Sequence, residues 1–100
     1  MREIDLIRVK GKDQPVAIYE AMDHYSEENF PALDGVIQAY GRGLERYRRR
    51  DWNGAVRFFE AALDQHALDR PSRVYLDRCR RFIAEPPQAS WDGVWVLAEK

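Results

Sequence analysis

The sequence predicts a mainly α-helical protein, with a short β-hairpin before three helices and an extended tryptophan-containing tail after them. Three observations predict this fold class. Near the N-terminus, two short apolar runs flank a turn rich in Gly, Asp and Pro. Through the middle of the chain, apolar residues recur at intervals of three and four. Pro86-Pro87 then ends helical structure, and two tryptophans follow close together.

The predicted hairpin occupies residues 1–20. Apolar residues recur along residues 4–9 and 16–19, and Gly11 and Pro15 fall between the two runs. Two strands alone are marginal in water, and a third strand or a packed helix is needed to hold them. We therefore expect the hairpin to be completed by the helices and the C-terminus, or by polypeptide upstream of it.

Residues 21–29 are polar and aperiodic, which predicts a linker, and residues 30–85 form the predicted helical module. Its first helix should begin at Phe30-Pro31, since proline suits the first turn, and end near residue 50. The second should be capped by Asp51 or Asn53 and end near residue 65.

The third helix should begin at residues 69–72, where the side chains of Asp69 and Ser72 can accept from free backbone N–H groups. The spacing also predicts which side of each helix is buried. The expected positions are Val36 or Ile37, Tyr40, Leu44 and Tyr47; then Ala55, Val56, Phe58, Phe59, Ala62 and Leu63; then Val74 or Tyr75, Leu76, Cys79, Phe82 and Ile83.

The first two helices resemble a tetratricopeptide repeat. The positions that carry the resemblance are Gly43, Tyr47, Trp52, Ala55, Phe59 and Ala62. Small residues at Gly43 and Ala55 let two antiparallel helices cross closely, and Phe59 fills the space beside them. About one and a half repeats are present, whereas arrays need about three. A generic three-helix bundle is the alternative.

The tail covers residues 86–100 and is expected to be extended after its two prolines. Trp91 and Trp95 should anchor it, because a tryptophan can bury a large area. We expect the tail to pack on the helices or to add a third strand to the hairpin.

The hairpin carries the phrase Val9-Lys10-Gly11-Lys12, followed by a Pro-Val-Ala-Ile-Tyr-Glu strand. Both resemble the last hairpin of the catalytic domain of class III adenylate and guanylate cyclases, and the layout of the whole chain resembles the C-terminal extension of bacterial adenylate cyclases. The resemblance implies that Lys10 contacts nucleotide phosphate in the parent enzyme. It also implies that the parent uses ATP with a divalent metal such as Mg²⁺. The family's metal-binding aspartates lie upstream of this hairpin, so we expect this chain alone to hold no metal or cofactor and to be catalytically inert.

Composition narrows the range of partners. Sixteen basic and seventeen acidic side chains nearly cancel, which argues against a dedicated nucleic-acid or membrane-surface binder. The arginine runs at 46–50 and 78–81 are interpreted as solvated helix faces. A lone cysteine, no long apolar run and no signal peptide favour a cytoplasmic location, with any membrane anchor left to upstream parts of the parent.

Taken together, these patterns predict a regulatory or assembly module at the C-terminus of a class III adenylate cyclase. Its expected partner is the upstream catalytic domain, and a homodimer formed through hairpin edges is a further expectation. The alternative is a tetratricopeptide-like adaptor whose helices bind a partner protein.

Overall fold

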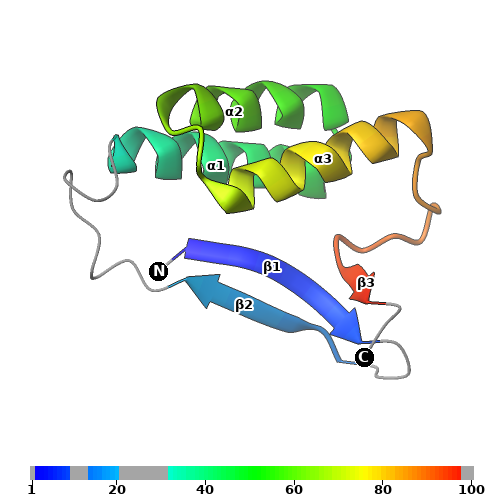
Figure 1. The fold of residues 1–100 in the computed structure, drawn as a ribbon. Helices are drawn as coiled ribbons and strands as arrows, with labels where there is room; N and C mark the ends of the chain where they lie inside the picture. Colours follow the sequence, from blue (N-terminus) through cyan, green and yellow to red (C-terminus); the bar gives the residue numbers. More distant parts are fainter. Residues whose placement is uncertain (1, 10–13, 21–31, 98–100) are drawn as a thin grey trace. The chain divides into compact units, whose positions relative to one another are not determined.

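The computed structural model describes residues 2–9, 14–20 and 32–97 (Figure 1). The chain divides into two compact units. One is a sheet unit that combines Met1–His24 with Ser90–Lys100, and the other is a helical unit, Tyr25–Ala89. The predicted linker at 21–29 and the expected helix start at Phe30-Pro31 lie outside the described residues.

The helical unit contains α1 (Leu33–Arg48), α2 (Trp52–Gln65) and α3 (Arg70–Ala84). The chain turns back tightly after α1 and again after α2, and α2 packs against both α1 and α3 (Figure 1). The prediction of three helices after a hairpin is confirmed.

The buried side of each helix follows the spacing seen in the sequence. The buried positions are Val36, Ala39, Tyr40, Gly43, Leu44 and Tyr47 in α1; Ala55, Phe59, Ala62 and Leu63 in α2; and Ser72, Tyr75, Leu76, Cys79 and Phe82 in α3. Val56 and Phe58, also expected on the buried side of α2, are only half-buried, because each lies one position to the side of the stripe formed by Ala55, Phe59 and Ala62. The expectation for Ile83 was wrong. Its side chain is 47% exposed, because it lies past the last residue of α3 that faces the other helices.

The helix starts differ in how they are capped. At α2, Asp51 accepts a hydrogen bond from the backbone N–H of Gly54 at 3.1 Å, as a cap residue should. At α3, the hydroxyl of Ser72 donates to the carboxylate of Asp69, and the Asp69 side chain makes no cap bond. The expected caps of α3 therefore bond each other, and this pair is buried.

The sheet unit contains β1 (Arg2–Val9), β2 (Val16–Glu20) and β3 (Trp95–Leu97), in the order β2-β1-β3. β1 and β2 form the antiparallel hairpin, with Leu6 opposite Ala17 and a register shift between Glu3 and Asp5. β3 lies parallel to the end of β1 and pairs along three residues, from Ile7 with Trp95 to Val9 with Leu97.

The tail is a strand over only part of its predicted length. Residues 86–89 belong to the helical unit, and the strand covers residues 95–97. Gly93 precedes it with a φ of 87°, a left-handed conformation that favours glycine. The backbone N–H of Val94 donates to the Asp92 carboxylate across this bend.

Candidate functional site

The crossing of α1 and α2 is set by a close approach at Gly43. A Cβ added there would lie 2.8 Å from the nearest atom of the Phe59 ring, which is fully buried. Ala55 and Ala62 are also fully buried on the facing side of α2. Small residues on both helices thus let one aromatic ring fill the contact.

Aromatic side chains link all three helices around this crossing. Phe59 stacks on Tyr75 with ring centroids 5.5 Å apart, and Tyr47 meets Tyr75 edge-on at 4.9 Å. Trp52 is half-buried, and the centroids of its ring and of the Phe82 ring are 4.8 Å apart. Each such pair adds about 0.5–1.5 kcal/mol beyond simple burial. The repeat-signature residues therefore pack together, and all of them except the half-buried Trp52 are buried.

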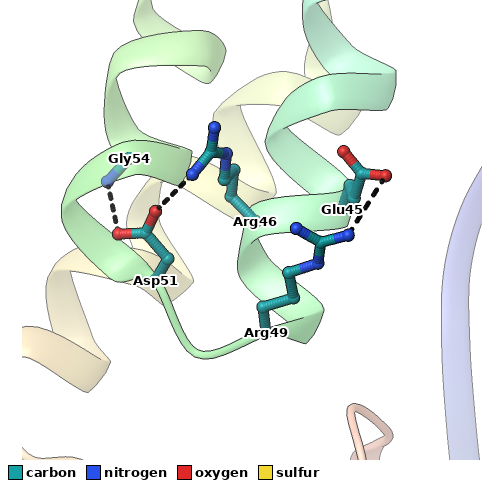
Figure 2. Close-up of polar contacts among 5 residues, drawn as sticks. All are labelled: Glu45, Arg46, Arg49, Asp51 and Gly54. Atoms are coloured by element: carbon teal, nitrogen blue, oxygen red, sulfur yellow. Dashed lines mark hydrogen bonds and ion pairs between the residues drawn. The ribbon is translucent and has the colours of Figure 1, made fainter.

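The turn between α1 and α2 is held by one carboxylate that makes two bonds. One oxygen of Asp51 accepts from the Gly54 N–H, and the other accepts from the Arg46 guanidinium at 3.1 Å, as Figure 2 shows. A second exposed pair, Glu45 with Arg49 at 3.8 Å, lies one turn apart at the C-terminal end of α1, where Arg49 follows the last residue of the helix (Figure 2). Exposed pairs contribute little stability, so the cap is the main role of Asp51.

Arg50 ties this same turn to the segment that follows α3. Its guanidinium donates to the carbonyl oxygens of Pro87 and Gln88, each at 2.9 Å, and lies 3.5 Å from that of Ala89. Arg50 itself has a φ of 66°, which is unusual for a residue with a side chain. The contacts fix the direction in which the chain leaves the helical unit.

The outer surface of the α1–α2 pair carries two adjoining hollows of about 590 and 330 Å³. They share Phe58 and Ala61, so they form one groove, which we call the α1–α2 groove. The charged residues that line it are three arginines and one aspartate: Arg42, Arg46, Arg57 and Asp51. The other lining residues are Gly35, Gln38, Ala39, Asn53, Gly54, Phe58, Ala61 and Gln65.

In the sheet unit, β3 is preceded by an ion pair to β1. The Arg8 guanidinium donates to the Asp92 carboxylate at 3.1 Å. This bond, together with the bond from the Val94 N–H, lowers the pKa of Asp92 below its ordinary value. Trp91 and Trp95, the expected anchors of the tail, are both half-buried.

Lys10, the predicted phosphate contact, lies outside the described residues. Among the residues that are described, no three His, Cys, Asp or Glu side chains lie close enough to hold a metal ion. Cys79 is fully buried, and burial raises the pKa of its thiol to about 12. No helix in the described ranges is both long and apolar enough to cross a membrane.

The chain is similar to part of a known adenylate cyclase. It is 29% identical over 83 residues to the terminal-differentiation specific adenylate cyclase of Dictyostelium discoideum. The match takes up 83% of this chain but 4% of that protein. A contiguous match of that length in 100 residues includes at least residues 18–83, and thus nearly all of the three helices, wherever it begins. The similarity supports a segment related to part of a cyclase.

A second similarity is to endoplasmic reticulum protein SC65. The human protein is 34% identical over 70 residues, which is 68% of this chain and 15% of that protein. The rat protein is 38% identical over 55 residues. No protein-family model matches the chain, and no solved structure matches it. The likeness to a tetratricopeptide repeat therefore stays a prediction.

Sequence reasoning missed two parts of this arrangement. Arg42 and Arg57 come from different helices and line the same groove because α1 and α2 cross. Local sequence spacing does not predict that crossing. The bonds of Arg50 to residues 87–89 were also missed, although its place just before the Asp51 cap marks a tight turn.

Proposed function

We propose that this chain is the C-terminal regulatory or assembly module of a class III adenylate cyclase, whose parent converts ATP to cyclic AMP and pyrophosphate. The similarity to a cyclase over at least residues 18–83 supports the proposal. The Val-Lys-Gly-Lys phrase of the hairpin supports it from the sequence side. In this proposal the parent's catalytic domain carries out the reaction, and this chain positions the last hairpin of that domain.

The pairing of β3 with β1 is the observation that carries the proposal. The sheet unit is built from residues on both sides of the helical unit in sequence. After β1 and β2 the chain forms the three helices, and it then returns to the sheet, where β3 pairs with β1. In this proposal the helices influence a neighbouring active site through the sheet, because β3 follows α3 along the chain and pairs with β1.

The outer strand of the hairpin supports a contact with upstream polypeptide. Val16 and Tyr19 on β2 are more than half exposed, and Ile18 is 37% exposed. No strand in the described ranges pairs with the outer edge of β2. Exposed apolar side chains on a strand at the edge of a sheet favour association unless something covers them. We propose that the parent's catalytic domain covers this edge, with self-association through β2 as the outcome when it does not.

Within that parent, Lys10 would contact the phosphates of ATP, which the family binds with a divalent metal. Cyclases of this class work as dimers with active sites at the subunit interface, so the module would act by biasing dimer geometry or the placement of Lys10. We place the module in the cytoplasm by the same proposal.

The test uses the parent protein. Removal of residues 31–100 should change the rate of cyclic AMP formation or the dimer fraction in sedimentation. A milder variant, Asp92→Ala, breaks the bond to Arg8 beside β3. It should change the rate of cyclic AMP formation or the dimer fraction by a smaller amount than the truncation does. An unchanged rate and an unchanged dimer in the truncated parent would refute the proposal.

A second candidate is an adaptor that binds a partner protein through its helices. The similarity to SC65 leaves room for it, since a match covering 68% of the chain includes α1 and α2 wherever it begins, and these helices therefore resemble part of a protein that is not named as a cyclase. The two candidates differ in one measurable respect. Unchanged cyclase activity of the parent with Asp92→Ala, together with a partner that still binds its helices, favours the adaptor, whereas changed activity favours the cyclase module.

A further inference from the structure

The α1–α2 groove combines unpaired positive charge with an apolar floor. Arg42 and Arg57 line it from opposite helices, and within the described ranges neither has a carboxylate partner. Arg46 already pairs with Asp51 at 3.1 Å. Since two guanidinium groups stay unneutralised, the groove has a net positive charge although the whole chain is nearly neutral.

The floor between these arginines is apolar. Phe58 and Ala61 belong to both hollows, and both are only half-buried. Ala39, at the base of the second hollow, is already buried. A small inorganic anion would use the arginines but would leave the Phe58 ring uncovered. A ligand that satisfies both features carries acidic groups and an apolar side chain.

The dimensions of the groove suit a short peptide. Along α1 it runs from Gly35 to Arg46, a span of twelve residues, which is about 16 Å at the rise of an α-helix. An extended peptide covers that distance with about five residues. Side chains alternate along such a peptide, so one apolar residue can face Phe58 while acidic neighbours reach the arginines on either side.

We propose that the α1–α2 groove binds an acidic peptide segment of a partner protein, with one apolar side chain of that segment covering Phe58 and Ala61. Arg42 and Arg57 pair with carboxylates of the segment, and Arg46 stays with Asp51. The proposal is independent of whether the parent is a cyclase, because it uses contacts within the helical unit alone.

The test uses the full 100-residue chain and a fluorescein-labelled peptide with the sequence Glu-Asp-Phe-Glu-Glu, followed by fluorescence anisotropy. The matched probes replace the phenylalanine by serine, or every acid by its amide. We expect saturable binding of the first peptide, weaker binding of the serine peptide and none of the amide peptide. Affinity should fall as salt rises, because the pairs lie near the surface.

The double variant R42E/R57E should lower the affinity by about tenfold or more, since two attractions become repulsions. R70E/R73E is the matched control, because it also reverses two charges, on exposed arginines of α3 outside the groove, and its affinity should stay within about twofold. Both changes are on exposed helix positions, and circular dichroism verifies that the variants fold. An equal loss of affinity in R70E/R73E would overturn the proposal, because it would mean general charge attraction.

Amide chemical shifts of the labelled chain locate the bound peptide. The proposal expects the largest shifts at residues 35–46 and 54–65, and it fails if they fall on α3 or on the sheet. It also fails if single-stranded RNA competes for the same residues with higher affinity, since the groove would then be a nucleic-acid site. Self-association that R42E/R57E abolishes would overturn it in favour of a second copy of this chain.

Discussion

Two glycines of α1 receive opposite predictions for the same substitution. Gly41→Ala adds a methyl group where nothing lies within 4 Å. Alanine is more favourable than glycine in a helix interior by about 1 kcal/mol, so this variant should be more stable by about that amount. Gly43→Ala gains the same helix propensity but places its Cβ 2.8–2.9 Å from three atoms of the Phe59 ring.

Carbon atoms pack best at about 3.5–4.0 Å, so the new methyl group overlaps the ring by more than half an ångström. The ring cannot move away easily, because it stacks on Tyr75 and meets Tyr40 at 5.9 Å. Overpacking of this kind costs about 1–3 kcal/mol. Gly43→Ala should therefore end up less stable than Gly41→Ala by about 1–3 kcal/mol, the propensity gain being common to both.

The assay is urea denaturation of the full chain followed by circular dichroism at 222 nm, which reports the helices. In thermal melts the gap between the two variants should be roughly 4–8 °C per kcal/mol for a unit of this size. The double variant Gly43→Ala/Phe59→Leu adds a check. Its destabilisation should be less than the sum of its parts, because the smaller side chain relieves the overlap. Equal stability of Gly41→Ala and Gly43→Ala would refute the close crossing of α1 and α2.

Three further predictions follow from single contacts. Asp51→Ala should destabilise the helices by about 1 kcal/mol through loss of the cap, measured by urea denaturation, while Asn53→Ala, at the other expected cap position, should change little. Cys79 should not react with a thiol reagent at pH 8 in the folded chain and should react fully in urea, because its pKa is raised to about 12 by burial; rapid reaction of the folded chain would contradict its burial. Since the folded-state pKa of Asp92 is lowered, its bond to Arg8 stabilises β3 fully above the ordinary value of 3.8 and is lost as pH falls through the lowered pKa. A carboxyl titration by NMR tests this, and a midpoint at or above 3.8 would contradict the bond.

The helices could be predicted from the sequence because each stripe depends on local spacing. Tyr40, Leu44 and Tyr47 recur at intervals of four and three, and all three are buried. The same pattern wrongly predicted that Ile83 is buried, since spacing shows which side of a helix is apolar but not where the neighbouring helix stops. The end of a buried stripe is set by tertiary packing.

The parallel position of β3 and the α1–α2 groove depend on residues that are distant in sequence. A strand of three residues has no period to detect, and its pairing with β1 joins residues almost ninety positions apart. In the groove, Arg42 and Arg57 are separated by the whole α1–α2 turn. The sequence interpretation grouped arginines by runs instead, and so assigned Arg46 and its neighbours to solvated faces.

The pairing of β3 with β1 is tested most directly by NMR of the uniformly labelled 100-residue chain. The account predicts nuclear Overhauser contacts between the backbones of Ile7 and Trp95 and of Arg8 and Val96, in the parallel pattern, together with slow amide exchange along residues 95–97. If Trp95 and Val96 show contacts only with the helices, or none with β1, the tail does not complete the sheet. The helices would then be an appendage to the hairpin, and the proposed coupling between them would be wrong.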